Sequence, residues 1–465
     1  MFEKVSYHRI FASAVFLISF YVYYLTIAPT TSFWDCGEFI TCAYTLGVPH
    51  PPGAPFYLLI GRIFSMLPWA ADIALRVNII SAITSALTIT FAYLILVRLI
   101  LIIRGNPKYF EDRIILYSSS IIGALTLAFS DSVWFNAVEA EVYSISLFFT
   151  AIIIWLILVW YEKADDPSSD RYLLLISYCI GLAIGVHLLN ILALPAIFII
   201  YYFRKHQFQW MSFAIFSMIS ILIFFGIYPG IVKAIPNFAL FLILKFGNLP
   251  TAYFFILLLI ILFAALTYAT IKRNRLVTTI LLCFLLILIG ASTFTGVYYR
   301  SKLNPVIDEN NPENMKNLVS YINREQYGDW GYIERRAPLW DYQIKKMYLR
   351  YFGWQFIGKG TLKDERGLLK DTVNFNGLWG LPFLIGLIGM TYHFQRDKKR
   401  ALAIFALFLL TGIAIVLYLN QYEPQPRERD YVYLGSFFAF ALWIGIGVAA
   451  ILDFISKTMG KKSPY

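Results

Sequence analysis

Long apolar runs recur along the chain, and they constrain its fold more than any other feature. Most are close to the length of about 20 residues that an α-helix needs to cross a hydrocarbon core about 30 Å thick. Only 14% of the residues are charged, whereas a soluble domain carries about 25%. We therefore expect an all-α polytopic membrane protein. The runs lie at 10–28, 74–103, 114–130, 141–161, 172–203, 210–232, 251–271, 277–297, 373–394, 401–420 and 432–455.

Basic residues gather in the breaks between these runs. Lysine and arginine in short loops stay on the cytoplasmic side of a membrane, so the clusters predict which helix ends lie inside. They also account for the net charge of +11 without a nucleic-acid partner. The clusters are Arg98, Arg104, Lys108 and Arg113; Lys163 and Arg171; Arg204 and Lys205; Lys272, Arg273 and Arg275; Arg396, Lys398, Lys399 and Arg400; and Lys457, Lys461 and Lys462.

The run 172–203 has basic residues at both ends, so it must cross the membrane an even number of times. As a single helix it would be about 48 Å long, which is too long for a core of about 30 Å. Its centre, Gly185–Asn190, is polar enough to turn. We therefore predict two short helices that meet near His187, a bundle of about twelve transmembrane helices, and two cytoplasmic termini.

The same orientation leaves several stretches on the outer side of the membrane. The longest of them is too charged for lipid and should form a small α-rich subdomain. Its basic residues do not violate the orientation, because long loops are translocated regardless of charge. We expect an N-terminal transmembrane module at 1–297 and a C-terminal one at 373–465. The outer stretches are 29–73, 130–140, 298–372 and 421–431.

The first outer stretch contains Ser32-Phe-Trp-Asp-Cys-Gly-Glu38, the densest group of chemically active side chains. Asp35 and Glu38 share one face if this segment is helical. A carboxylate in an aromatic, partly dry pocket can serve as a general base. Alternatively, Ser32 and Asp35 form a capping box, and Gly47 ends a helix over 33–46.

A proline-rich segment, Gly47–Pro55, follows in the same stretch. Prolines make it a stiff turn that should hold His50 near Asp35. The alternative is a rigid connector with an incidental histidine. Apolar residues at helical spacing over 56–67 then predict an amphipathic helix that lies in the membrane interface. Its Arg62 either meets a phosphate or extends along the helix toward water.

The second outer stretch carries Glu139 and Glu141 immediately before the hydrophobic part of a transmembrane run. A pair of acids at the mouth of a helix could hold a hydroxyl group or a sugar. Alternatively, they are the negative charges that a helix N-terminus favours.

The last outer stretch places Arg427 and Arg429 between two prolines and a transmembrane run. Arginines in a short outer loop run against the cytoplasmic bias of basic residues. The planar guanidinium fork suits phosphate, and a lipid phosphate lies at this depth. The alternative is a local ion-pair network with Glu423, Glu428 and Asp430.

Motifs of several soluble chemistries are absent from the sequence. It has no phosphate-binding P-loop, no Rossmann glycine fingerprint and no His/Cys metal set. We therefore expect no resident cofactor and assign no metal ligands, although a cation held by Asp35 and Glu38 stays open. Cys36 and Cys42 could pair if their side of the membrane is oxidising.

These motifs together resemble a bacterial family that is similar to the eukaryotic transmembrane O-mannosyltransferase of plexin- and Met-type receptor domains. The family looks like a GT-C glycosyltransferase. Such enzymes have many transmembrane helices, take a sugar from a polyprenyl or dolichyl phosphate, and keep an essential acid in the first outer loop. The matching segments are Trp34–Glu38, Gly47–Gly53, Ala140–Tyr143, Gly185–Asn190 and Pro426–Tyr431.

The resemblance implies a division of labour among the outer residues. Asp35, with Glu38 close by, would be the catalytic acid position, and Asp35 would take the proton from a Ser or Thr hydroxyl during inverting transfer. Arg427 and Arg429 would stabilise the departing lipid phosphate. Further donor-phosphate residues would be His50 and Arg62. The acceptor or sugar would meet Trp34, Glu139, Glu141 and His187.

The expected function is therefore transfer of a sugar, with mannose as the best guess, from a polyprenyl-phosphate carrier to exported proteins. The chain would lie in a bacterial inner membrane with its active site on the periplasmic face. One alternative is a transporter or flippase of lipid-linked sugars, yet transporters concentrate polar groups at the midplane in repeated halves. A non-catalytic scaffold and a GT-C transferase acting on a glycolipid are the others.

Overall fold

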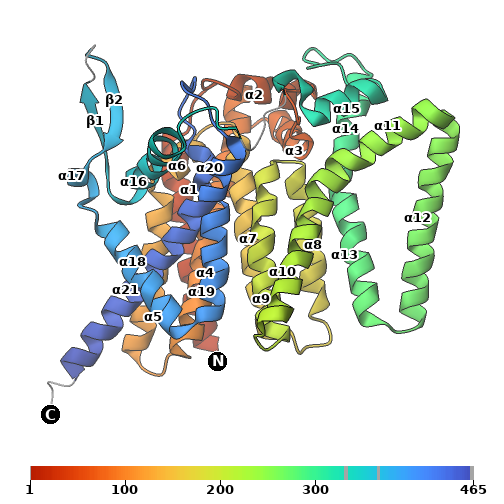
Figure 1. Cartoon of the computed structure of the whole chain (residues 1–465). Coiled ribbons are helices and arrows are strands. Elements are labelled where there is room, and N and C mark those ends of the chain that lie inside the picture. The colour runs from red at the N-terminus through yellow and green to blue at the C-terminus, as the bar shows by residue number, and fades with distance from the viewer. Residues whose placement is uncertain (1, 329–333, 364–366, 461–465) are drawn as a thin grey trace.

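The computed structural model describes residues 2–328, 334–363 and 367–460, and it is almost entirely helical (Figure 1). The N-terminal part comprises α1 (Phe2–Thr26), α2 (Cys36–Thr45), α3 (Pro55–Met66), α4 (Ile73–Arg104), α5 (Phe110–Ala128), α6 (Asp131–Ala137), α7 (Val142–Lys163), α8 (Asp170–Ile184), the 3₁₀ helix η1 (Leu188–Ala193) and α9 (Leu194–Lys205).

The middle of the chain comprises α10 (Trp210–Phe225), the π-helix η2 (Gly226–Ala234), α11 (Ile235–Phe246), α12 (Asn248–Ile271), α13 (Arg275–Ala291), η3 (Ser292–Phe294), α14 (Thr295–Ser301), α15 (Met315–Asn323) and η4 (Glu325–Tyr327). The C-terminal part comprises the π-helix η5 (Leu339–Leu349), α16 (Arg350–Phe356), β1 (Lys359–Lys363), β2 (Leu369–Val373), α17 (Phe375–Leu378), α18 (Leu381–Arg396), α19 (Lys398–Leu410), α20 (Ile413–Leu419), η6 (Asp430–Tyr433) and α21 (Leu434–Gly460).

The predicted polytopic membrane fold is confirmed. Within the described residues, nine helical segments are long and apolar enough to cross a membrane. The pair α5–α6, which bends by 67°, brings the number to ten if it counts as one span. The predicted count of about twelve is not confirmed, because α8 and α18 have only 15 and 16 residues and a perpendicular crossing takes about 20.

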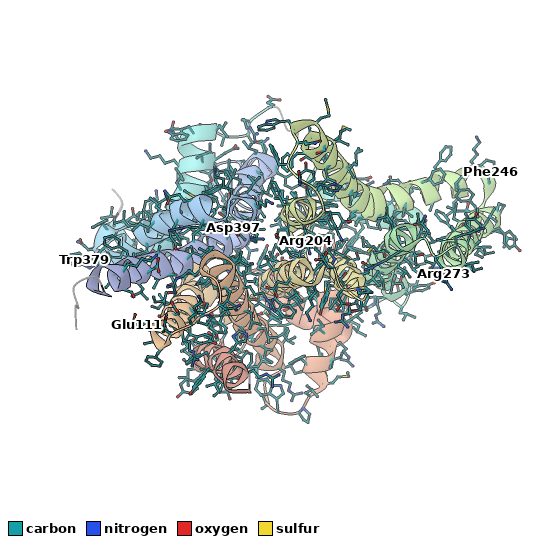
Figure 2. All side chains as sticks on the ribbon, turned by 90° about the horizontal axis from the view of Figure 1, so that it is seen from below. Glu111, Arg204, Phe246, Arg273, Trp379 and Asp397 are labelled. Carbon is teal, nitrogen blue, oxygen red and sulfur yellow. The ribbon has the colours of Figure 1, made fainter. Side chains whose placement is uncertain are left out.

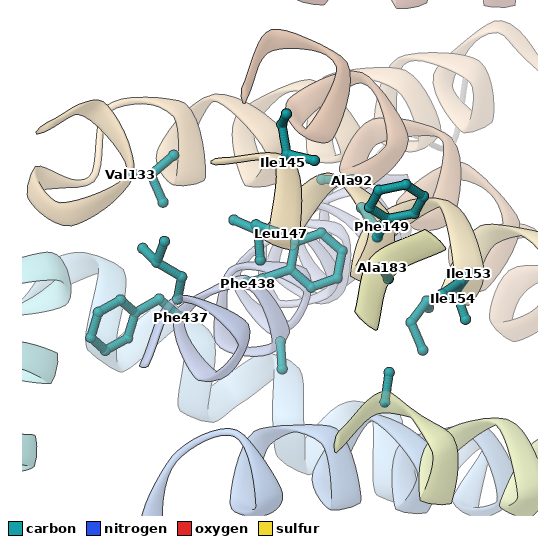
Figure 3. Packing of buried hydrophobic residues seen from close by; sticks show 14 of the residues in the cluster. Ala92, Val133, Ile145, Leu147, Phe149, Ile153, Ile154, Ala183, Phe437 and Phe438 are labelled. Carbon is teal, nitrogen blue, oxygen red and sulfur yellow. The ribbon is translucent and has the colours of Figure 1, made fainter. Parts of the chain in front are cut away.

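Helices of the bundle approach one another closely at glycines. A Cβ atom on Gly123 of α5 would lie 2.7 Å from the Cα of Gly445 in α21. At the crossing of α18 and α21, a Cβ on Gly389 would lie 1.8 Å from the carbonyl oxygen of Trp443. In lipid, van der Waals packing drives helix association, so small residues at the contacts stabilise the bundle. Figure 3 shows buried side chains of the surrounding core, including Phe438 of α21 and Leu147 of α7.

The break predicted near His187 is confirmed. Helix α8 ends at Ile184, with Gly185 as its C-terminal cap. The chain then turns through η1, and α9 starts with a proline in its first turn, a position where the missing N–H costs no hydrogen bond.

The segment after α9 differs from the predicted helix at 210–232. The helical backbone continues from α10 through η2 into α11, so one bent helical stretch covers Trp210–Phe246. Figure 1 shows α11 leaning away from the bundle at its upper end, and α12 and α13 forming a hairpin beside the body. The polar Lys233 lies inside this helical stretch, where the sequence predicts a loop.

The long outer stretch packs onto the bundle at two separate places (Figure 1). Residues of α14 and α15 lie against α3 and α11, and Val48 bridges Asp308. On the other side, η5 and α16 lie against α20 and α18. Strands β1 and β2 form an antiparallel hairpin in which Lys359 faces Val373. The sequence predicts a small α-rich subdomain here and does not predict this β-hairpin.

Candidate active site

Asp35 precedes α2, but its side chain does not cap that helix. It occupies the N-cap position with α-helical φ/ψ angles, and no backbone N–H of the first turn bonds to its carboxylate. The alternative that Ser32 and Asp35 form a capping box is therefore wrong. The other end of α2 closes through Leu46 in the left-handed region, where the Gly47 N–H bonds to the Cys42 carbonyl at 3.0 Å.

A cleft of about 640 Å³ lies beside α2 at the upper end of the bundle in Figure 1. Four chain segments that are far apart in the sequence contribute to its walls: the first outer loop, the α7–α8 region, the long outer loop and the arginine loop. Among the predicted site residues, the cleft is lined by Trp34, Asp35, Glu38, His50, His187, Arg427 and Arg429.

Arg427 connects the acids of two different segments. Its Nη2 donates to Asp35 Oδ2 at 2.6 Å, and its Nη1 donates to Glu141 Oε1 at 3.4 Å. The guanidinium also lies 5.7 Å from the centroid of the Trp34 ring and 5.0 Å from that of Tyr431. The residue predicted to bind phosphate therefore touches the predicted general base.

Glu141 lies behind Arg427 rather than on the wall of the cleft. Its side chain is buried, and its Oε2 atom has no hydrogen-bond partner in the described part of the chain. Burial, with the nearby charge of Asp35, raises the pKa of Glu141 to about 8, and burial raises the pKa of Glu139 to about 7. At neutral pH Glu141 is therefore protonated. The positive charge of Arg427 is then paired with the carboxylate of Asp35 alone.

Glu38 and His50 form an ion pair on the wall of the cleft. One carboxylate oxygen lies 2.5 Å from His50 Nδ1, and the other accepts the His50 backbone N–H at 2.7 Å. Burial opposes this pairing, but the hydrogen bonds and mutual charge outweigh it, so the pKa of Glu38 is lowered and that of His50 is raised. The proline-rich turn thus holds His50 in the cleft, against a carboxylate that favours its positively charged form.

The arginine loop is held from outside by α16. Glu428 accepts from Arg350 at 2.6 and 3.1 Å and from the Tyr351 hydroxyl. That hydroxyl in turn accepts the Arg429 backbone N–H at 3.0 Å. The Nε of Arg429 is buried and has no partner among the described residues.

The loop's own acids therefore have other partners than its arginines. Glu428 bonds to α16, Glu423 pairs with Lys346 at 2.7 Å, and Asp430 accepts from Ser132. The alternative of a local ion-pair network around Arg427 and Arg429 is wrong in the described structure.

His187 faces the cleft at the break between α8 and α9. Its Nδ1 accepts the Leu189 N–H at 3.3 Å, and its ring centroid lies 5.1 Å from that of Tyr143. Burial lowers the pKa of His187 to about 4, so the ring is neutral at physiological pH. A neutral imidazole beside an aromatic ring can bond a hydroxyl group.

The cleft also contains several residues that the sequence does not predict as site residues. Arg324, Gln326 and Tyr327 reach the cleft from the long outer loop. Tyr143 and Tyr431 also line it, with ring centroids 4.2 Å apart. The aromatic and basic character of the long loop is visible in the sequence, but no local pattern indicates which of its residues meet the cleft.

Besides Glu141, two predicted site residues, Arg62 and Glu139, are not among the residues that line the cleft. Arg62 of α3 bonds to the Tyr44 carbonyl, and its guanidinium lies 5.6 Å from the Tyr44 ring centroid. Glu139 groups with Cys36 and Glu141, whose possible ligand atoms lie within 4.8 Å of one another. That is the one group of three such ligands within the described part of the chain, and it includes neither Asp35 nor Glu38. The thiols of Cys36 and Cys42 are free.

Comparison with known proteins identifies relatives of one part of the chain. Residues 35–210 match the family described as protein O-mannosyl-transferase TMEM260 N-terminal domain, which confirms the resemblance seen in the motifs. Protein O-mannosyl-transferase tmem260 of Dictyostelium discoideum is 28% identical over 32% of this chain. TMEM260 of Mus musculus is 26% identical over 37%. The chain spans only 17% and 22% of the length of these two relatives.

Among solved structures, an oligosaccharyltransferase of Archaeoglobus fulgidus in the apo form aligns with 98% of this chain and 52% of its own. The TM-score is 0.49 and the sequence identity 12%. The same oligosaccharyltransferase tethered to an acceptor peptide that contains an NVT sequon aligns with a TM-score of 0.47 and 10% identity, over 98% of this chain and 51% of its own.

Proposed function

We propose that this chain is an inverting membrane glycosyltransferase. It transfers a sugar, which we take to be mannose, from a polyprenyl-phosphate carrier to Ser or Thr hydroxyls of exported proteins. The observation that carries the proposal is the cleft in which Asp35 lies beside Arg427 and Arg429 at one end of a membrane bundle. The likeness of residues 35–210 to protein O-mannosyl-transferases supports the reaction class.

The arginine loop binds the phosphate of the donor. Among the described residues, the buried Nε of Arg429 has no partner, and a buried unsatisfied donor is costly until an acceptor meets it. A donor phosphate should therefore bind more tightly to this arginine than to one at the protein surface. His50 lies in the same cleft, and Glu38 raises its pKa, which favours the positively charged form.

Asp35 acts as the general base. Its carboxylate accepts a hydrogen bond from Arg427 at 2.6 Å. A bound phosphate competes for this guanidinium, and the carboxylate then turns to the acceptor. The acceptor oxygen loses its proton to Asp35 and attacks the anomeric carbon, and the carbon–oxygen bond to the phosphate breaks. The phosphate leaves with the bonding electrons, and Arg427 and Arg429 stabilise its charge.

The aromatic side of the cleft holds the sugar. Tyr143 and Tyr431 form a pair beside His187, and hexoses pack their apolar faces on such rings. Trp34, which is 59% exposed at the cleft, stands where an acceptor segment enters. We place the site on the periplasmic face of a bacterial inner membrane, with no soluble cofactor.

A metal is not required in this proposal. Both carboxylate oxygens of Glu38 bond to His50, so a cation shared with Asp35 would compete with these bonds. Arginines supply the charge that a divalent cation would bring. Sugar transfer by the purified protein should therefore persist in excess EDTA. Loss of transfer on chelation, with recovery on adding Mn²⁺ or Mg²⁺, would contradict this part of the proposal.

The test of the proposed function is Asp35→Asn, which keeps the shape of the side chain and removes the base. Donor binding should be retained, whereas transfer to a Ser/Thr acceptor peptide should fall by about 10²–10⁴-fold. The matched control is Asp341→Asn, because Asp341 is exposed in η5 and lies outside the cleft. Undiminished transfer by Asp35→Asn would remove Asp35 from the mechanism.

A further inference from the structure

A second cavity, of about 660 Å³, lies between α1, α4 and α5 at the end of the bundle opposite the candidate active site. Figure 2 is seen from this end, with Glu111 labelled at the start of α5. The polar part of the lining contains three arginines, one histidine and one acid. They are Arg9, Arg98, Arg113, His8 and Glu162.

The cavity carries uncompensated positive charge. Arg98 pairs with Glu162. Arg9 and Arg113 have no acidic partner within 4 Å among the described residues, and the Nε of Arg113 is buried without any hydrogen-bond partner. The neighbouring Arg104, by contrast, is neutralised by two acids, at 3.2 and 2.9 Å. Within the described part of the chain, Arg9 and Arg113 thus lie beside one opening without an ion-pair partner.

Aromatic rings and exposed apolar side chains adjoin the residues that line the cavity. His8 bonds to the Tyr93 hydroxyl at 3.2 Å, and its ring stacks on Tyr93 and Tyr117 with centroids 5.5 and 6.5 Å apart. Ile10 follows Arg9 and is 55% exposed, and Ile114 follows Arg113 and is 48% exposed. Each of these two arginines is therefore followed in the chain by an exposed apolar residue, as expected of a helix surface in contact with lipid.

We propose that this cavity binds the headgroup of an anionic phospholipid. The phosphate lies between Arg9 and Arg113, and the acyl chains follow the apolar residues of α1 and α5. Basic pockets between transmembrane helices are suited to such headgroups. A phosphate also gives the buried Nε of Arg113 the acceptor that it lacks. This inference does not depend on the proposed glycosyltransferase activity.

The test uses the purified full-length chain in detergent, titrated with fluorescent phosphatidylglycerol. Binding should be saturable, and phosphatidylcholine should not compete. The double variant Arg9→Gln/Arg113→Gln should bind roughly 30-fold more weakly. The matched control is Lys272→Gln/Arg273→Gln, which removes two exposed charges from the same end of the bundle. It should bind phosphatidylglycerol like the unmodified protein.

Three results would overturn the inference. Unchanged binding by Arg9→Gln/Arg113→Gln would move the lipid elsewhere. An equal loss in the control pair would reduce the effect to general surface charge. Displacement of the lipid by inorganic phosphate at equal concentration would make the site one for a soluble phosphate. If the double variant does not fold, Arg113→Lys serves instead, since it keeps the charge but removes the fork, and it should bind more weakly than unmodified protein.

Discussion

Arg427 is the residue on which the electrostatics of the cleft depend. It is half-buried between two acids that differ in protonation, because Glu141 has a pKa of about 8. Its second face lies against two aromatic rings, which fixes the plane of the guanidinium. A fixed fork that is held by one ionised acid is ready to exchange that acid for a phosphate.

Substitutions of the two arginines should therefore weaken donor binding, and not only slow the transfer step. Arg427→Gln and Arg429→Gln should each weaken binding of a polyprenyl-phosphate sugar by about tenfold or more, since a hydrogen bond to a charged group contributes about 1.5–3 kcal/mol. Transfer should fall as well. Donor binding is measured by fluorescence titration on the same folded protein. Normal donor affinity in both variants would assign the phosphate to another site.

Glu141 predicts how stability changes with pH. Its folded pKa is about 8 against an ordinary value of 4.5. Between these values the folded state keeps a proton that the unfolded state has released, so this group makes stability fall as pH rises across that window. Glu141→Gln cannot ionise and should remove this fall. Thermal unfolding between pH 5 and pH 8, taken as about the limits of the window, measures it.

The control for this prediction is Glu325→Gln, because Glu325 is exposed in η4. Relative to the unmodified protein, Glu141→Gln should gain stability steadily with pH, whereas Glu325→Gln should not. Melting curves of Glu141→Gln that run parallel to those of the unmodified protein at every pH would show that Glu141 ionises normally in the fold.

Helix α16 positions the arginine loop without touching the cleft. Arg350 and Tyr351 both bond to Glu428, and the Tyr351 hydroxyl also accepts the Arg429 N–H. These contacts fix the loop between its two arginines. The segment of the long outer stretch that contains α16 therefore braces the arginine loop, which its sequence does not reveal.

Tyr351→Phe tests this brace, because it keeps the ring and removes only the hydroxyl. Donor affinity should fall by about tenfold, the usual cost of a lost hydrogen bond to a charged group, while transfer at saturating donor should change little. The matched control is Tyr348→Phe. Its hydroxyl is also buried and bonds to Ser436 at 2.7 Å, but it does not contact the loop. An equal loss in both variants would indicate general destabilisation.

Across the molecule, the two ends of the bundle differ in what they carry. The candidate active site, α2 and α15 lie at one end, whereas the turn between α18 and α19, marked by Asp397 in Figure 2, lies at the other. The second cavity and the exposed charges of the α12–α13 turn share this other end. The cleft that contains the candidate general base, Asp35, and the positively charged surface therefore lie at opposite ends of the bundle.

Labelling of single cysteines checks the orientation. Lys316 of α15 and Lys398 of α19 are both exposed. In a Cys283→Ser background, Lys316→Cys should react with a membrane-impermeant maleimide added outside intact cells. Lys398→Cys should react only after permeabilisation, because basic clusters in short loops are expected on the cytoplasmic side. Labelling of Lys398→Cys in intact cells, with Lys316→Cys protected, would invert the molecule.

The sequence alone is sufficient to predict the membrane class and the break near His187, because hydropathy, charge and helix-breaking residues are local properties of the chain. It also identifies Asp35, His50 and Arg427 as candidate site residues, from the motifs in which they lie. The predicted number of about twelve spanning helices is not confirmed, since α8 and α18 have only 15 and 16 residues. Nor does the sequence indicate the hairpin of β1 and β2, whose pairing depends on a turn in a polar loop.

Only the tertiary structure decided which of these side chains meet. Asp35 and Arg427 are 392 positions apart and bond at 2.6 Å, while Glu141 reaches the same guanidinium from a third segment. Their meeting depends on how α7, α21 and the first outer loop pack, and packing is a sum of many contacts that no single segment encodes. The protonation of Glu141 follows from the same packing, because burial raises its pKa.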